Sequence, residues 1–446
     1  MKNSLPVSQI IPELKEALNT SCRAVLSAPP GSGKTTLTPQ AFLEEAWMQG
    51  KQIIMLQPRR AAARAAACRI ADLLGEEVGQ TVGWTVRGES KTSRNTRIEI
   101  VTEGILTRRL QSDPELSGVG MVIFDEFHER SLNTDLGLAL CLDMQEGLRD
   151  DLRLLVMSAT LDIAAVTTLL GKCRSIHTEG RMFPVETRWG LAPEIRDLSA
   201  TAARTVLKLL NEQSGSILVF LPGAGEINAT AEMLRPHVPE NVIIAPLYGS
   251  MTRQEQDAAL RPAPPDQRKI VLATNIAETS LTIDGIRIVV DCGYARHAFF
   301  DPSTGMTSLR LERISKASAE QRKGRAGRLE PGICCRLWSE HDHLRLAEFD
   351  RPEILDADLA PLCLELANWG TTAGQLRWID PPPEAALATA GELLRELGAL
   401  NHDKHITPTG KKLAALPIHP RLGAMLLAAE KLKLIPLACE LAALLE

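Results

Sequence analysis

The sequence predicts two α/β domains, each built on a parallel β-sheet, followed by a mostly helical region. Short apolar runs alternate with helix-like stretches through the first 190 residues, the same alternation returns after them, and helical periodicity dominates after residue 345. Buried parallel strands are near-continuous runs of Val, Ile and Leu, and helices follow them along the chain. We therefore expect two doubly wound domains in tandem.

The first domain is expected to span residues 1–180 and to hold five buried strands. Helix-like sequences at 61–74 and 134–148 lie between some of them. Each predicted strand is short, aliphatic and bounded by turn residues, as expected for a strand covered by helices on both faces. The predicted strands are AVLSA (24–28), QIIMLQ (52–57), RIEIVT (97–102), VGMVIFD (119–125) and LRLLVMSAT (152–160).

The second domain is expected to span residues 181–345. A stretch rich in Gly, Pro and polar side chains, TEGRMFPVETRWG (178–190), is interpreted as the linker that leads into it. The strand pattern then repeats, which indicates a second sheet. Its predicted strands are SILVFL (216–221), NVIIAPLY (241–248), KIVLAT (269–274), RIVVDCG (287–293) and ICCRLW (333–338).

The remaining residues are expected to form helical accessory domains. Three consecutive prolines, Pro381 to Pro383, separate two helical stretches, and ALNHDKHITPTG (399–410) indicates a small β-wing. We expect a winged-helix-like domain at 346–412 and a further helical domain at 413–446. Because the apolar helical pattern is still running at ACELAALLE, we expect the parent protein to continue beyond Glu446.

Composition predicts a globular protein of the cytoplasm. Of the 446 residues, 44% are hydrophobic and 24% charged, which excludes a disordered chain. The net charge of -5 argues against a small, uniformly basic nucleic-acid binder but allows a local basic surface. The N-terminal segment lacks the apolar core of a signal peptide, and no run is long enough to span a membrane. Nine cysteines, an odd number in a large chain, indicate reduced thiols.

A glycine-rich loop follows the first predicted strand. Its sequence, Ala28-Pro29-Pro30-Gly31-Ser32-Gly33-Lys34-Thr35-Thr36, matches G-x-x-x-x-G-K-[ST] except that Ala28 replaces the first glycine. Glycines allow backbone N–H groups to turn toward phosphate oxygens. Lys34 supplies a positive charge to the β- and γ-phosphates, and the Thr35 hydroxyl is placed for Mg²⁺. The loop therefore predicts a nucleotide site.

Two carboxylates stand at the end of the fourth predicted strand, in VIFDEFHER. Acidic side chains at the end of a buried strand are costly unless they meet a cation. Asp125 could hold Mg²⁺ through water, and Glu126 could orient or deprotonate an attacking water. His128 is not expected to bind a metal, because a second histidine at helical spacing is missing.

Two further clusters are assigned to structure rather than to chemistry. The adjacent Cys334 and Cys335 lie in a predicted strand and are expected in the core or at its surface. The segment His341 to His343 is expected to be a polar loop. Metal binding is the less favoured alternative for both.

Several motifs together resemble those of the DEAH-box RNA helicases of superfamily 2. Asp125-Glu126-Phe127-His128 resembles the DEAH box, with Phe127 in place of the usual Ala. The resemblance covers about residues 20–340, and the later region resembles the winged helix and the start of the helical ratchet domain of that family. The other motifs are matched, in family order, by Pro58-Arg59-Arg60, Thr102-Glu103-Gly104, Ser158-Ala159-Thr160, Thr274-Asn275-Ile276-Ala277-Glu278-Thr279-Ser280 and Gln321-Arg322-Lys323-Gly324-Arg325-Ala326-Gly327-Arg328.

The resemblance implies two RecA-like domains with ATP and Mg²⁺ in the cleft between them. The residues from Ala28 to Thr36 would bind the phosphates, and Thr35 and Asp125 the metal. Hydrolysis would be served by Lys34, Asp125, Glu126 and His128 from the first domain, and by Gln321, Arg325 and Arg328 from the second. The two arginines would act as arginine fingers on the γ-phosphate. Ser158 and Thr160 would couple hydrolysis to domain movement.

The resemblance also places the nucleoside. Arg69 matches the arginine that holds one face of the base, and Thr282 and Asp284 would lie toward the ribose. The family's aromatic residue for the other face falls on Leu260, which cannot stack as a ring does. The nucleotide preference therefore stays open.

Single-stranded RNA is the partner that the resemblance implies. Hydroxyl groups, backbone N–H groups and arginines suit sequence-independent contacts with phosphate and sugar. No aromatic-rich RNA-reading motif is present, so sequence specificity is not expected. We expect a monomer without a membrane partner. The residues that would contact the strand are Arg59, Arg60, Thr102, Gly104, Thr274, Asn275 and Thr279.

Together these features predict a helicase that couples ATP hydrolysis to 3′-to-5′ movement on RNA and to duplex unwinding. Two alternatives stay open. The chain could be a nucleotide-switched clamp on RNA or a ribonucleoprotein that does not unwind, or it could be a DNA translocase.

Overall fold

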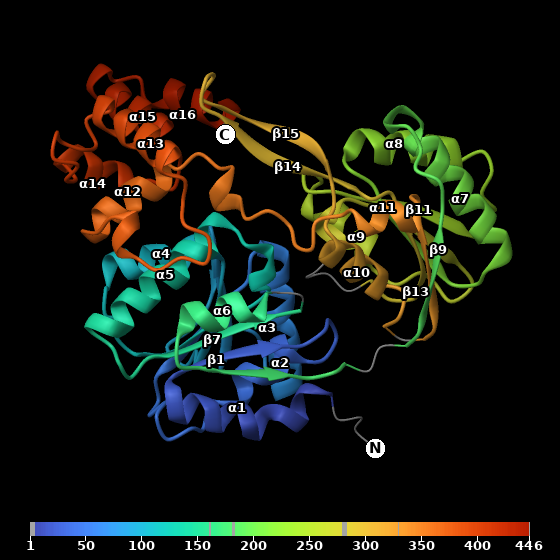
Figure 1. The fold of residues 1–446 in the computed structure, drawn as a ribbon, viewed down its shortest axis with the longest axis horizontal. Coiled ribbons are helices and arrows are strands. Elements are labelled where there is room, and N and C mark those ends of the chain that lie inside the picture. Colours follow the sequence, from blue (N-terminus) through green and yellow to red (C-terminus); the bar gives the residue numbers. More distant parts are fainter. Residues whose placement is uncertain (1–4, 160–161, 181–182, 279–282, 329, 446) are drawn as a thin grey trace.

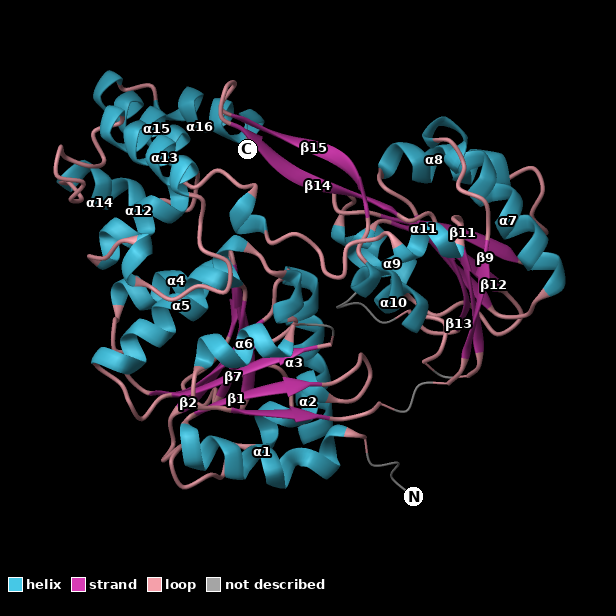
Figure 2. Ribbon diagram, viewed as in Figure 1, coloured by secondary structure: helices cyan, strands magenta, loops and turns pink. Residues whose placement is uncertain are grey.

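The computed structural model describes residues 5–159, 162–180, 183–278, 283–328 and 330–445. It contains two α/β lobes side by side, with a helical region packed on the first (Figure 1). We call the part from α1 to β8 the first lobe, the part from β9 to α11 the second lobe, and the part from η4 to α16 the helical region. Strands form the centre of both lobes (Figure 2), so the predicted fold class is confirmed.

The first lobe contains an eight-stranded sheet in the order β4-β3-β5-β2-β6-β7-β1-β8. All neighbours are parallel except β3 and β4, which are antiparallel. The five predicted strands correspond to β1, β2, β5, β6 and β7, and the sequence missed β3, β4 and β8. The strands are β1 (Arg23–Ser27), β2 (Gln52–Leu56), β3 (Val82–Val86), β4 (Glu89–Lys91), β5 (Ile98–Val101), β6 (Val119–Phe124), β7 (Arg153–Ser158) and β8 (Arg174–His177).

Helices cover both faces of this sheet because successive side chains of each strand point to opposite sides. In β2, Ile53 belongs to the cluster under α1 and α3, whereas Ile54 belongs to the cluster under α4, α5 and α6. The helices of the lobe are α1 (Val7–Ser21), α2 (Lys34–Ala41), α3 (Arg60–Leu74), α4 (Glu103–Ser112), η1 (Phe127–Glu129), α5 (Leu132–Gly147) and α6 (Ile163–Leu170).

The second lobe contains a six-stranded, wholly parallel sheet in the order β11-β12-β10-β13-β16-β9. Buried residues of α7 and α8 pack on one face, and those of α9 on the other. The strands are β9 (Val185–Trp189), β10 (Ser216–Phe220), β11 (Val242–Leu247), β12 (Arg268–Ala273), β13 (Ile286–Asp291) and β16 (Gly332–Arg336). The helices are η2 (Ile195–Asp197), α7 (Leu198–Glu212), α8 (Ala224–Leu234), α9 (Arg253–Leu260), η3 (Asn275–Ala277), α10 (Lys316–Gly324) and α11 (Glu340–Leu344).

Two sequence predictions are wrong in this lobe. Residues 185–189, assigned to a linker, form the edge strand β9 and pair with β16. The segment from His341 to His343 lies in α11 rather than in a loop, and the His343 ring contacts that of Trp189 at 5.2 Å. A parallel edge strand with polar, half-exposed side chains carries little hydrophobic signal, which explains the first error. Cys334 and Cys335 are buried, as expected.

A long antiparallel hairpin leaves the second lobe and reaches the helical region (Figure 1). It consists of β14 (Tyr294–Asp301) and β15 (Met306–Arg313). At its tip, Arg421 Nη1 of α15 donates a hydrogen bond to the carbonyl oxygen of Gly305 (2.6 Å). The hairpin therefore links the second lobe to the helical region at a point far from the chain connection between them.

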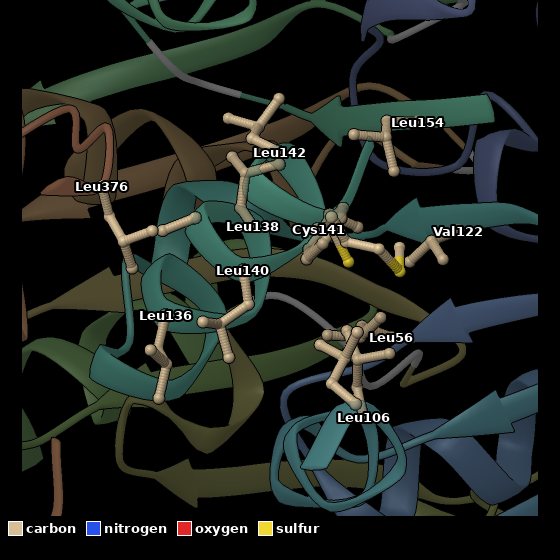
Figure 3. Packing of buried hydrophobic residues seen from close by; sticks show 14 of the residues in the cluster. Leu56, Leu106, Val122, Leu136, Leu138, Leu140, Cys141, Leu142, Leu154 and Leu376 are labelled. Atoms are coloured by element: carbon tan, nitrogen blue, oxygen red, sulfur yellow. The ribbon is translucent and has the colours of Figure 1, made fainter. Parts of the chain in front are cut away.

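The helical region shares a hydrophobic core with the first lobe. Figure 3 shows α5 between the strands that carry Val122 and Leu154 and the helical region that carries Leu376. These parts therefore form one packed body. The elements are η4 (Glu353–Leu355), α12 (Ala360–Trp369), η5 (Ala373–Gln375), α13 (Glu384–Glu396), α14 (Pro408–Ala414), α15 (Pro420–Leu432) and α16 (Ile435–Leu445). The expected wing is reduced to a single antiparallel bridge between Leu400 and Ile406.

None of the helices in the described part of the chain is both long and apolar enough to cross a membrane.

Candidate nucleotide site and strand-binding surface

The phosphate loop connects β1 to α2 and has the backbone that the motif requires. Gly31 (φ +82°) and Gly33 (φ +92°) adopt left-handed conformations, which glycine tolerates best. A Cβ at Gly33 would lie 2.9 Å from Leu5 Cδ1, so a larger residue would also collide there. The N-terminus of α2 follows at Lys34, and its free N–H groups and positive dipole end favour an anion.

Asp125 lies at the carboxyl end of β6, where three donors meet its carboxylate. Thr35 Oγ1 (2.6 Å) and Gln57 Nε2 (2.5 Å) donate to Oδ2, and the backbone N–H of Glu126 donates to Oδ1 (2.9 Å). Burial, together with the charge of Glu126, raises the pKa of Asp125. The contact with Thr35 joins the carboxylate to the phosphate loop.

Glu126 is held beside Lys34 by an unusual backbone conformation. Its φ is +51°, and such left-handed conformations at non-glycine residues are enriched at functional sites. Lys34 Nζ lies 3.2 Å from Glu126 Oε1. Burial alone would raise the pKa of Glu126, but the charge of Lys34 lowers it, so the carboxylate is ionised.

His128 lies behind these carboxylates. Its Nδ1 is 3.5 Å from Glu126 Oε2 and 3.4 Å from the hydroxyl of Ser158. Burial lowers the pKa of His128 to about 4, so the ring is neutral near pH 7. Ser158 also accepts, at its carbonyl oxygen, a hydrogen bond from the N–H of Ala28 (2.9 Å). The end of β7 therefore contacts both the DEFH segment and the phosphate loop, whereas Thr160 lies outside the described residues.

Phe127 occupies the position of the usual Ala without disturbing its neighbours. Its ring is buried and packs edge-on against Phe124 with a centroid separation of 6.3 Å. The substitution therefore extends the core and leaves Asp125 and Glu126 facing Lys34.

The second lobe brings its arginines to the site at different depths. Arg328 lines the phosphate cavity with Lys34 and Thr35. Arg325 donates from both Nε (2.8 Å) and Nη2 to the main-chain carbonyl oxygen of Glu278, and its charge also lowers the pKa of Glu126. Gln321 is buried and lines two neighbouring cavities with His128. Among these three, only Arg328 faces the phosphate cavity directly.

The phosphate cavity has a volume of about 310 Å³. Pro30, Gly31, Gly33, Thr36 and the Gln57 side chain line it together with the residues already named. Three predicted loop residues lie elsewhere: Ala28 is fully buried, Ser32 is 1% exposed, and Pro29 lines a separate cavity.

The predicted base site is only partly assembled. Arg69 lines the phosphate cavity beside the small side chains of Ala62 and Ala66. Leu260 instead packs against the hydrophobic cluster of the second lobe. Asp284 is exposed. Its negative charge raises the pKa of Arg328, whereas burial lowers it. Thr282 lies outside the described residues.

The predicted strand-binding residues are also brought together only in part. Arg59 crosses the gap between lobes and donates from Nη1 to the carbonyl oxygens of Asn275 (3.0 Å) and Ile276 (2.9 Å). Arg59 also pairs with Glu129 (3.3 Å). Arg59, Glu129 and Asn275 line a cavity of about 480 Å³ between the lobes. Arg296, Arg313 and Arg351 also line it.

The other predicted strand residues are more dispersed. Arg60 pairs with Glu89 on the surface of the first lobe (3.1 Å), Thr102 is the N-cap of α4, and Gly104 is exposed. Thr274 follows β12 directly, and Thr279 lies outside the described residues.

The oxygen atoms at the mouth of the phosphate loop suit Mg²⁺. Thr35 Oγ1 and Asp125 Oδ2 are hard donors 2.6 Å apart. No group of three or more His, Cys, Asp or Glu side chains that could hold a metal occurs in the described parts of the chain. Mg²⁺ usually combines one or two protein oxygens with phosphate oxygens and water. The arrangement therefore fits an ion that enters with a nucleotide.

Sequence reasoning missed two residues of this site. Gln57 was assigned only to the end of a strand, although its polar side chain there was a usable signal. Glu278 was assigned only to a motif, yet its side chain pairs with Arg322 (3.0 Å) while its carbonyl oxygen holds Arg325.

These features define a two-lobed P-loop protein whose phosphate loop, Glu126 and opposing Arg328 converge on one cavity. Comparison with known proteins agrees. The chain matches the family model "DEAD/DEAH box helicase" over residues 8–169, "Helicase conserved C-terminal domain" over 201–330, and "Helicase associated domain (HA2), winged-helix" over 392–418. The chain belongs to the DEAD/DEAH box helicase family, which confirms the resemblance found in the sequence.

Curated relatives include ATP-dependent RNA helicases from bacteria and yeast. The chain is 49% identical to ATP-dependent RNA helicase HrpB of Escherichia coli over 445 residues, covering 100% of the chain and 55% of that protein. It is 40% identical to the pre-mRNA-splicing factor ATP-dependent RNA helicase prp22 of Schizosaccharomyces pombe over 442 residues, covering 97% of this chain and 38% of that protein. The crystal structure of Escherichia coli DEAH/RHA helicase HrpB superposes with a TM-score of 0.92 at 49% identity, covering 99% of this chain and 56% of that one. The chain thus spans about half the length of the bacterial relative.

Proposed function

We propose that this chain is the motor portion of an ATP-dependent RNA helicase, which hydrolyses ATP between its lobes and moves 3′-to-5′ along single-stranded RNA to separate duplexes. The observation that supports this most directly is the convergence of Lys34 and Glu126 from the first lobe with Arg328 from the second on one cavity. A site built from both lobes can convert phosphate chemistry into lobe movement.

Hydrolysis begins when the nucleotide phosphates compete with Glu126 for Lys34. Lys34 Nζ is paired with Glu126 at 3.2 Å. A triphosphate draws the ammonium group toward the β- and γ-phosphates, which releases the carboxylate to accept a proton from the attacking water. Thr35 and Asp125 would hold Mg²⁺, which neutralises charge that develops on the phosphate oxygens.

The arginines complete the site as the lobes close. Arg328 already faces the cavity, and Arg325 must exchange the carbonyl oxygen of Glu278 for the γ-phosphate. Arginine fingers contribute about 10³–10⁵-fold to the rate of phosphoryl transfer. Glu278 lies three residues after Asn275. Movement of Arg325 away from the carbonyl oxygen of Glu278 would therefore also alter the contacts of the segment proposed to bind the strand.

The first test is the Glu126→Gln variant. Replacing the general base should lower kcat for ATP hydrolysis by about 10²–10⁴-fold while nucleotide binding persists. Glu45→Gln is the matched control, because Glu45 pairs with Lys15 and neither residue lines the phosphate cavity. Hydrolysis by Glu126→Gln at the rate of the unmodified chain would contradict the assignment.

The second test compares polymers and products. The proposal would be supported if single-stranded RNA stimulates ATP hydrolysis more than DNA does, and if only duplexes that carry a 3′ tail are displaced. RNA-stimulated hydrolysis without displacement would indicate a clamp instead. Stronger stimulation by DNA would indicate a DNA translocase. Arg59→Ala should weaken RNA binding, measured by fluorescence anisotropy.

A further inference from the structure

Gln57 stands beside the metal-binding end of the phosphate cavity, although none of the helicase motifs described above includes it. It follows the last residue of β2, and β2 pairs in parallel with β6 so that Leu56 lies opposite Phe124. One residue further along both strands, Gln57 comes next to Asp125. The sheet register therefore fixes the contact between these two side chains.

The two ends of the Gln57 amide have different surroundings. The side chain is 2% exposed, and Nε2 donates to Asp125 Oδ2 at 2.5 Å. An ionised carboxylate can only accept hydrogen bonds, so the amide nitrogen must be the atom that faces it. The carbonyl oxygen Oε1 is then left buried, and it has no hydrogen-bond partner among the described residues.

A buried amide oxygen without a partner at the wall of a cavity points to a ligand that supplies a donor. Gln57 lines the same cavity as Lys34 and Thr35. Its Nε2 shares the acceptor Asp125 Oδ2 with Thr35 Oγ1, which places the amide at the oxygen atoms suited to Mg²⁺. Water bound to such an ion is a strong hydrogen-bond donor.

We infer that Gln57 is a positioning residue for the metal of this nucleotide site: its amide nitrogen orients the Asp125 carboxylate, and its amide oxygen accepts a hydrogen bond from the hydrated ion. The inference rests on the proposed nucleotide function. Partners that orient metal ligands commonly change metal affinity or activity by about 10–100-fold when they are removed.

The test replaces Gln57 with Met, which retains the length of the side chain and removes both polar ends. Gln145→Met is the matched control, because Gln145 is also a buried glutamine of the first lobe. It accepts from Arg23 Nε (2.6 Å) and donates to the carbonyl oxygen of Leu152 (2.6 Å), away from the cavity. Gln57→Asn, which keeps the amide but shortens its reach, serves as a second variant if Gln57→Met does not fold.

The readout is the affinity for a fluorescent ADP analogue, titrated in EDTA and at a series of Mg²⁺ concentrations. Gln57→Met should bind the analogue in EDTA within about twofold of the unmodified chain, and should need about tenfold more Mg²⁺ for half of the metal-dependent gain in affinity. The Mg²⁺ requirement of Gln57→Asn should lie between those of the unmodified chain and Gln57→Met. Gln145→Met should leave the Mg²⁺ dependence unchanged.

An unchanged Mg²⁺ dependence in both Gln57 variants would overturn the inference, and so would an equal shift in Gln145→Met. Failure of the proposed nucleotide site is distinguishable from this, because the unmodified chain would then bind no nucleotide at all, whereas a clamp or a DNA translocase would still bind it.

Discussion

Replacing Arg322 should destabilise the second lobe severely, because its charge is buried between two carboxylates. The side chain is 1% exposed, and it lies 3.0 Å from Glu278 and 2.9 Å from Asp291. At an effective dielectric constant of 20, each pair contributes about 5 kcal/mol of Coulomb attraction, which the cost of burial offsets in large part. Arg322→Met would leave two buried negative charges without their partner. Breaking a buried ion pair in this way costs about 3–5 kcal/mol.

The assay should report on the second lobe alone, since a chain of several domains need not unfold in one step. Native-state hydrogen exchange followed by mass spectrometry resolves β13 and α10 separately. A loss of about 3–5 kcal/mol corresponds to about 10²–10⁴-fold faster exchange there, at 1.4 kcal/mol per factor of ten.

The control for Arg322→Met is Arg188→Met on strand β9 of the same sheet. Arg188 pairs with Glu186 at 2.7 Å, but both side chains are exposed, so the loss should stay below about 1 kcal/mol. Equal effects of the two substitutions would refute the reasoning that burial decides the cost.

Three further substitutions test the folded state elsewhere. Burial raises the pKa of Glu103 to about 7, although the Thr134 hydroxyl donates to it at 2.7 Å. The stability that this group contributes is complete below pH 4.5 and is lost as the pH rises toward 7, a change of about 3 kcal/mol. The melting temperature of Glu103→Gln, relative to that of the unmodified chain, should therefore rise from pH 5 to pH 8. A difference in melting temperature that does not depend on pH would contradict this. Gly410→Ala should cost about 1–3 kcal/mol, because a Cβ there overlaps the carbonyl oxygen of Ala399. A Cβ at Gly391 in α13 meets no atom within 4 Å, so Gly391→Ala should raise the free energy of unfolding by about 0.5–1 kcal/mol. A loss of stability in both glycine variants would be inconsistent with the packing described.

The sequence predicted those parts of the molecule that local patterns determine. The ten buried strands and the phosphate loop each depend on a few adjacent residues, so hydrophobic runs and glycine spacing were sufficient. Strand β9 and the β14–β15 hairpin were missed because the side chains of β9 and β14 are mostly only half-buried and those of β15 are mostly exposed, so they carry little hydrophobic signal.

The parts of the site that depend on distant contacts were beyond sequence reasoning. Nothing near Arg325 in the chain indicates that its guanidinium group rests on the carbonyl oxygen of Glu278. The position of Leu260 likewise depends on how α9 packs against its own sheet. Gln57 became significant only when the register of β2 and β6 placed it beside Asp125.

The contacts of Arg59 have a thermodynamic consequence. Its guanidinium group is already satisfied by Glu129 and by two carbonyl oxygens of the opposite lobe. Any anion that recruits this arginine must first release those oxygens, and whatever pulls the lobes apart makes the arginine available. By reciprocity, anion binding at Arg59 and separation of the lobes must then favour each other by the same free energy. A single side chain can thus connect the occupancy of one site with the shape of the whole molecule.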